Sequence, residues 1–191
     1  MAGCTVGQGE GWVTSDRLYV AECWNGAYDL RPDFFAASPF RDTMQIRVQR
    51  GSDLAEVSDG VSVLVNEVST IRASLLGTPI TVGLPPGLVA GDPTQEPPLV
   101  SLALYLQLSC HNQNAVVYAL GGQIVFEELF DGDPNEKSAA EKLTVATFEV
   151  DVADPHDAAP GTIDVPDDKR SHLSGYFRFF FERGRPGQPF P

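Results

Sequence analysis

The sequence is dominated by short segments in which apolar and polar residues alternate, and this pattern constrains the fold more than any other feature. The clearest segment is 43–50, where Met44, Ile46 and Val48 alternate with polar neighbours. Successive side chains of a strand point to opposite faces of its sheet, so the alternation predicts a strand with one buried face. Similar segments occur at 12–23, 60–67, 79–84, 99–109, 115–120, 122–130, 143–153 and 172–183.

Turn-forming pairs such as Asn25-Gly26 and Gly121-Gly122 separate these segments. Short strands at this spacing indicate an all-β fold, an antiparallel β-sandwich of the jelly-roll or immunoglobulin-like type. Helix is predicted in only two short segments, 68–76 and 133–142. At 191 residues the chain is long enough for one domain with a substantial core.

The residues around Cys4 predict the subcellular location of the protein. Ala2-Gly3-Cys4 has the small residues and the cysteine that end a bacterial lipoprotein leader, so we expect the Cys4 thiol to carry a lipid and Met1 to replace the end of a removed leader. Residues 1–11 would then be the anchor site and a flexible, glycine-rich tether, and residues 12–191 a single domain. In the alternative interpretation, Cys4 is an exposed thiol near a start codon.

The other two cysteines, Cys23 and Cys110, are expected to form a disulfide, because the cell envelope is oxidising. Such a bridge closes a long loop and should stabilise the domain by about 4–5 kcal/mol. Cys110 falls on the same alternating positions as Leu104, Leu106 and Leu108 and should point into the core with them. Cys23 points inward only if its strand bends. Two buried free thiols are the alternative.

The chain is strongly acidic, with a net charge of −13 from 26 acidic and 13 basic residues. Such a surface repels nucleic acid and anionic lipid headgroups, so we expect no nucleic-acid partner and membrane attachment only through an acyl chain. No apolar run in the sequence approaches the roughly 20 residues that a membrane-spanning helix needs.

Catalytic motifs are scarce, and we expect a protein that is not an enzyme. The segment from Glu149 through Asp151 to Asp154 resembles the Glu-x-Asp-x-x-Glu signature of jelly-roll glycoside hydrolases of the laminarinase type, which would imply that the carboxylates of Glu149 and Asp154 act on a glycosidic bond. Aspartate replaces the final glutamate of that signature. Because Val150 and Val152 take the inward positions, an outward polar face explains the same residues.

An acidic segment, 154–170, offers the only cofactor site that we expect, a weak one for calcium. Otherwise no cofactor or metal is predicted. The candidate calcium ligands are Asp154, Asp157, Asp164, Asp167 and Asp168.

The last predicted strand is the best candidate for a partner surface. Phe177, Phe179 and Phe181 alternate with Tyr176, Arg178 and Phe180, so aromatic side chains stand on both faces. A strand of this kind is either central and covered on both sides, or it exposes an apolar patch that marks a partner.

Three segments, residues 29–35, 40–51 and 176–184, carry a resemblance to a known group of proteins. On these segments the chain resembles predicted bacterial outer-membrane lipoproteins of uncharacterised function. The resemblance implies a leader peptide, a lipid on Cys4 and an outer-membrane location, with which Thr5 agrees because it is not the aspartate that favours inner-membrane retention. We therefore expect a non-catalytic envelope lipoprotein that is structural, adhesive or complex-forming. A carbohydrate- or calcium-dependent binding module is the alternative.

Overall fold

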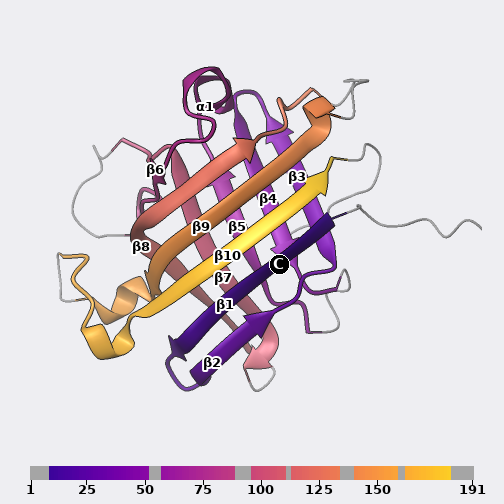
Figure 1. The fold of residues 1–191 in the computed structure, drawn as a ribbon. Helices are drawn as coiled ribbons and strands as arrows, with labels where there is room; N and C mark the ends of the chain where they lie inside the picture. The colour runs from indigo at the N-terminus through magenta and orange to yellow at the C-terminus, as the bar shows by residue number, and fades with distance from the viewer. Residues whose placement is uncertain are drawn as a thin grey trace, which may run out of the picture.

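The computed structural model describes residues 9–51, 57–88, 96–110, 113–133, 140–158 and 162–181. The described strands form one antiparallel sheet of ten strands that folds over on itself into two packed layers (Figure 1). The strand order is β2-β1-β10-β9-β8-β7-β5-β4-β3, and β6 pairs with β8 outside this path. The prediction of an all-β, sandwich-like fold is confirmed, although the two layers belong to one continuous sheet.

The front layer of Figure 1 contains β2, β1, β10 and β9, and the back layer contains β7, β5, β4 and β3. The strands are β1 (Gly9–Val20), β2 (Trp24–Leu30), β3 (Phe34–Phe40), β4 (Thr43–Gln49), β5 (Gly60–Val65), β6 (Ile80–Thr81), β7 (Val100–Cys110), β8 (Gln113–Glu128), β9 (Leu143–Ala153) and β10 (Ser171–Phe180). The helical elements are α1 (Val68–Ser74) and the 3-10 turns η1 (Ala140–Lys142), η2 (Pro155–Asp157) and η3 (Asp167–Lys169).

The core lies between the two layers and is built from the inward half of each alternating strand. Met44, Ile46 and Val48 of β4 are fully buried there, as their alternation predicts. Phe177 and Phe179 of β10 meet them from the front layer. Burying such side chains supplies most of the free energy that favours folding, at about 25 cal/mol for each Å² of apolar surface.

The helix α1 confirms the prediction for 68–76, although it ends at Ser74. Its first turn is capped from a distant part of the chain: the Asp42 carboxylate accepts hydrogen bonds from the Ser69 backbone N–H and from the Ser69 hydroxyl, each at 2.8 Å. Most of the helix predicted over 133–142 lies outside the described residues. No helix in the described ranges is long and apolar enough to span a bilayer.

The sequence prediction of a turn at Gly121-Gly122 is wrong, because both glycines lie within β8. The register shifts between Ala119 and Gly121, which marks a bulge, and Gly122 takes a φ of +115° there. The first part of β8 pairs with β7 and the later part with β9, so the bulge lies where the sheet passes from the back layer to the front layer.

The first hairpin also differs from its prediction. Its turn lies between Val20 and Trp24, so that Asn25 and Gly26 are paired residues of β2 and not a turn. At the other end of β1, residues 9–11 belong to the strand and not to a flexible tether, because Gly9 pairs with Phe179 of β10. Gly9 lies so close to the Phe35 ring that a Cβ would collide with it, so its role is close packing.

The hairpin turn explains how Cys23 reaches Cys110. Cys23 follows the end of β1 instead of continuing its alternation, so the parity of the strand does not apply to it. Its sulfur lies at disulfide-bonding distance from that of Cys110, and the two Cα atoms are 4.8 Å apart. The structure thus pairs the two cysteines that the sequence predicts to pair, and joins the front hairpin to the end of β7 in the back layer.

Candidate functional site

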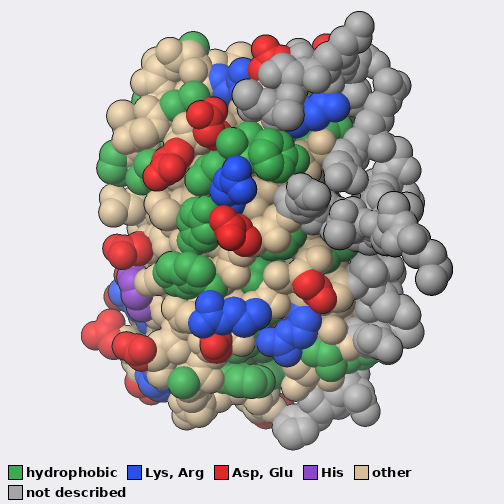
Figure 2. All heavy atoms as spheres, turned by 45° about the vertical axis from the view of Figure 1, so that its right-hand side comes forward, with side chains coloured by type: hydrophobic (Ala, Val, Ile, Leu, Met, Phe, Trp, Pro, Cys, Tyr) green, Lys and Arg blue, Asp and Glu red, His purple; other side chains and the backbone are tan. Residues whose placement is uncertain are grey.

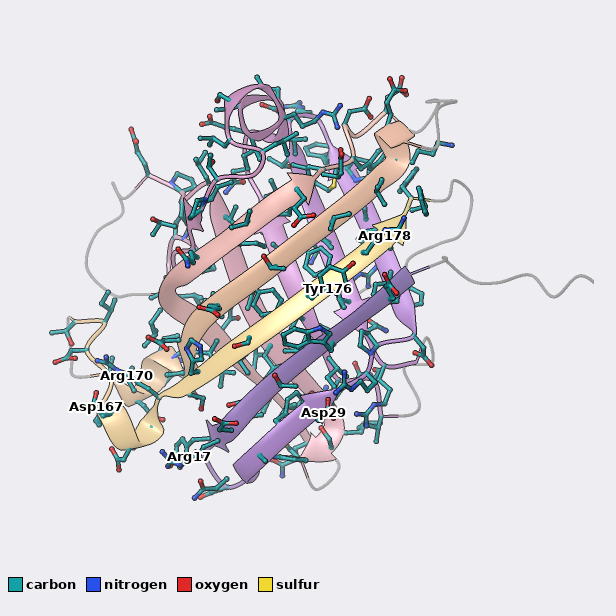
Figure 3. All side chains as sticks on the ribbon, in the orientation of Figure 1. Arg17, Asp29, Asp167, Arg170, Tyr176 and Arg178 are labelled. Carbon is teal, nitrogen blue, oxygen red and sulfur yellow. A yellow bond between two sulfur atoms is a disulfide. The ribbon has the colours of Figure 1, made fainter. Side chains whose placement is uncertain are left out.

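The outer face of β10 and β1 carries a group of large aromatic side chains. Tyr176 and Phe180 are half-buried on this face, and Trp12 of β1 stands directly opposite Tyr176. Arg178 lies between the two aromatic residues of β10, and Figure 3 shows Tyr176 and Arg178 on the side of the front layer that faces the viewer. We call Trp12, Tyr176, Arg178 and Phe180 the aromatic face.

The sequence left two alternatives for this strand, and the structure shows a feature of each. β10 is central, since it lies between β9 and β1, and the inward Phe177 and Phe179 are fully buried. Its outward residues from Tyr176 to Phe180 remain half-exposed among the described parts of the chain. Figure 2 shows hydrophobic side chains in several groups from the upper to the lower part of the visible surface, with basic and acidic side chains between them.

Charged groups fix the side chains of the aromatic face. The Arg178 guanidinium lies 5.3 Å from the centroid of the Phe180 ring, within cation–π range. The Tyr176 hydroxyl donates a hydrogen bond to the Glu10 carboxylate at 3.4 Å. Partial burial and then the negative charge of Glu10 raise the pKa of Tyr176, so this phenol stays protonated and can donate. The aromatic face therefore combines apolar rings with one donor cation.

Beside the aromatic face, a row of polar side chains crosses the front layer at right angles to the strands. The register places these residues opposite one another on five neighbouring strands, and they are Thr14, Ser174, Glu149, Gln123 and Thr81. Adjacent strands are about 4.8 Å apart, so the row is roughly 19 Å long. The next row contains His172 and Asp151, which are also cross-strand partners.

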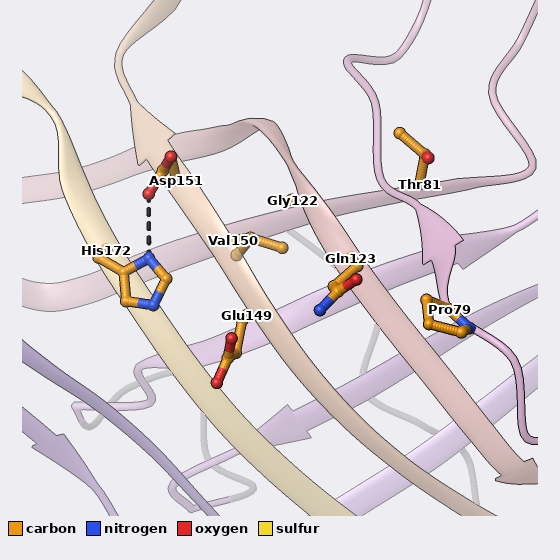
Figure 4. Close-up of a pocket in the computed structure, with 8 residues that line it drawn as sticks. All are labelled: Pro79, Thr81, Gly122, Gln123, Glu149, Val150, Asp151 and His172. Atoms are coloured by element: carbon orange, nitrogen blue, oxygen red, sulfur yellow. Dashed lines mark hydrogen bonds and ion pairs between the residues drawn. The ribbon is translucent and has the colours of Figure 1, made fainter.

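The surface is hollowed along these two rows. One hollow of about 370 Å³ is lined by Thr81, Gln123, Glu149, Asp151 and His172, as Figure 4 shows. A second hollow, of about 290 Å³, lies on the other side of His172 and reaches Ser174 and Thr14. His172 lines both hollows, so they adjoin one another, and we call the two together the polar trough.

The carboxylates that suggested a glycosidase lie in two different places, on β9 and in the turn that follows it. Glu149 and Asp151 point outward into the polar trough, while Val150 and Val152 between them are fully buried. Asp154 lies beyond the end of β9, where its carboxylate accepts hydrogen bonds from the backbone N–H of His156 at 2.9 Å and pairs with the His156 ring at 2.8 Å. The hydrogen bond from the His156 backbone makes Asp154 the N-terminal cap of the turn η2.

His172 and Asp151 form a polar pair in the trough. The Nδ1 atom of His172 lies 3.0 Å from the Asp151 carboxylate, and both side chains are more than half exposed. Ser174 is on the same face two residues further along β10, but no hydrogen bond joins its hydroxyl to the imidazole within the described part of the chain. The pair can orient the ring of His172 toward a ligand.

The acidic segment that suggested calcium is largely paired with cations of its own chain. Asp157 binds Lys169, Asp164 binds Arg170 at 2.6 Å, and Asp167 lies 3.8 Å from Arg170. The bond to Asp157 raises the pKa of Lys169. The backbone carbonyl of Asp168 accepts a hydrogen bond from Arg17. Within the described ranges no cluster of three metal-ligating side chains occurs, and the calcium site stays a prediction.

Sequence reasoning missed a buried polar cluster near the disulfide. Asp59 is only 3% exposed; its carboxylate accepts hydrogen bonds from the backbone N–H of Gln107 at 3.0 Å and the hydroxyl of Ser109 at 2.6 Å. Burial raises the pKa of Asp59, and these bonds oppose that shift. Tyr28 is buried beside it, and burial raises the pKa of its phenol as well. The one indication in the sequence was that Asp59 directly precedes β5, a strand with buried residues.

Arg47 and Gln49 also depart from their predicted exposure. They point away from the core on β4, as the alternation predicts, yet they are only 6% and 4% exposed. The Tyr105 hydroxyl donates a hydrogen bond to the Gln49 side chain at 2.5 Å. Burial lowers the pKa of Arg47. The outer face of the back layer is therefore partly closed here by its own polar side chains.

The chain shows no significant similarity to any protein-family model, curated protein or solved structure that was compared with it. Cys4, the predicted lipidation site, and the tail after Phe181 lie outside the described residues.

Proposed function

We propose that this chain is a non-catalytic lipoprotein of the cell envelope and that it binds a protein partner through the aromatic face. The observation that carries the proposal is the half-exposed set of Trp12, Tyr176 and Phe180 on the central strands of the front layer. An antiparallel sheet can leave one face to solvent, but a contiguous group of apolar side chains on that face is typical of an interaction surface.

The chemistry of the aromatic face favours a protein as the ligand. Tryptophan, tyrosine and arginine are the residues that contribute most to the energy of protein–protein interfaces. Arg178 and Glu10 are cross-strand partners on this face, so it offers a positive and a negative group beside the rings. We expect the partner to pack apolar side chains against the rings that lie beside these two charges.

The disulfide and the predicted anchor support an envelope location. A Cys23–Cys110 bridge persists in oxidising compartments, and the periplasm and the cell surface are such compartments. Cys4 precedes Gly9 by five residues, a stretch of chain that reaches at most about 18 Å. Since Gly9 pairs with Phe179, a lipid on Cys4 would hold the aromatic face close to the membrane. The partner is therefore a protein of that membrane.

Affinity capture from envelope membranes tests the proposal, with a variant of the aromatic face as the decisive comparison. The substitution Phe180→Asp places a charge on this face, and Val116→Asp makes a comparable change at an exposed apolar residue that pairs with Tyr105 of the back layer. We expect one envelope protein to be captured by the wild type and by Val116→Asp, and lost with Phe180→Asp. Capture that is equal with all three proteins, or absent with all three, would refute the aromatic face as the binding surface.

A further inference from the structure

We infer that the polar trough binds a neutral oligosaccharide chain. The inference goes beyond the proposed protein partner and does not depend on it, because the trough residues are distinct from the aromatic face. It rests on the shape of the trough, the chemistry of its lining and the charges around it.

The lining suits a ligand with many hydroxyl groups. Thr14, Ser174, Gln123 and Thr81 can each donate and accept hydrogen bonds, while Glu149 accepts only. They recur at the strand spacing along the row, so a chain lying in the trough meets a new polar group about every 4.8 Å. Hydrogen bonds from ligand hydroxyls to a carboxylate are the stronger kind, because the acceptor is charged.

Charge excludes an anionic ligand. Glu149 and Asp151 are exposed carboxylates at the centre of the trough. At the other end of the trough the two arginines lie beside acidic side chains: Arg170 is ion-paired with Asp164 at 2.6 Å, and Arg17 shares the lining with Asp16. An acidic glycan or a nucleic acid would therefore meet two exposed carboxylates at the centre and no net positive charge at this end.

The position of the trough argues against a peptide that pairs as an extra strand. The trough crosses the middle of the front layer, where the backbones of β8, β9 and β10 are already paired on both sides. Strand addition requires a free sheet edge. A saccharide needs no free backbone groups, because side-chain donors and acceptors such as those of the row are enough to bind its hydroxyls.

Glycan-array screening followed by calorimetric titration tests this inference. The array carries neutral, acidic and amino-sugar oligosaccharides, and tetralysine is titrated as the cationic probe. We expect the wild type to bind neutral oligosaccharides. Both Glu149→Gln and Gln123→Ala change exposed side chains and should weaken that binding about tenfold each, as for loss of a hydrogen bond to a charged or amide group.

The control is Glu128→Gln, which makes the same chemical change at an exposed carboxylate of β8 opposite Val145, outside the trough. It should bind like the wild type. Thermal melts of all variants show whether the fold is intact. Failure of every neutral glycan to bind, binding that neither trough variant weakens, or binding of tetralysine alone would each overturn the inference. Saccharide binding that persists in Phe180→Asp separates this result from the fate of the protein-partner proposal.

Discussion

Removing the disulfide should have the largest effect on stability of any single perturbation of this chain. Cys23 and Cys110 are separated by 87 positions, and their bond joins the β1–β2 turn to the end of β7. In the chain-entropy treatment, closing a loop of this length lowers the free energy of the folded state relative to the unfolded state by about 4.5 kcal/mol. Domains of this kind have about 5–15 kcal/mol in total, so the loss should be about 30% of the stability or more.

Urea denaturation followed by fluorescence measures this effect. Cys23→Ala, Cys110→Ala and the double variant should each lose nearly the same free energy of unfolding, because either substitution alone breaks the bond. The wild type in a reducing agent should lose a similar amount. Small losses that add in the double variant would refute the reasoning, since they would mean that two independent packing sites had been changed and no bridge broken.

Three further predictions concern single positions. Because burial raises the pKa of Asp59, its contribution to stability is greatest below its unfolded pKa and decreases as the pH rises through the folded pKa. Asp59→Asn should therefore gain stability relative to the wild type as the pH rises above the ordinary aspartate value of 3.8 in urea titrations, and a difference that is independent of pH would contradict this. Gly122→Ala should lower the free energy of unfolding by more than about 1 kcal/mol, because φ is +115° and a Cβ would collide with the β9 backbone. Gly121→Ala places its Cβ in open space and should change the thermal midpoint little, so equal effects would be inconsistent with the bulge. Asp42→Ala should cost about 1 kcal/mol in the same assay because α1 loses its cap, and no loss would show that the cap is dispensable.

The strands that alternate most regularly were predictable from the sequence, and the reason is that their inner faces are buried. Met44, Ile46 and Val48 lie in the core because a one-residue shift would expose all three. By contrast, β2 and β3 were not predicted. Asn25 and Gly26 favour a turn by themselves, but the hairpin register and the Cys23 turn place them in a strand. Local preference was overridden there by long-range pairing.

The candidate sites were predictable only in part. Tyr176, Arg178 and Phe180 could be assigned to one face from their spacing alone. The polar trough could not be found in this way, because its residues come from strands far apart in the chain. Thr14 and Thr81 share a row with Glu149 only through the order β1-β10-β9-β8 and the pairing of β6 with β8. Strand order and register are tertiary properties that alternation does not encode.

Site-specific photo-cross-linking in intact envelope membranes tests the central claim most directly. A photoreactive amino acid replaces Arg178 on the aromatic face in one protein and Val116 of the back layer in another. We expect a cross-link from position 178 to one membrane protein, identified by mass spectrometry, and none from position 116. Cross-links to the same proteins from both positions, or from neither, would contradict it.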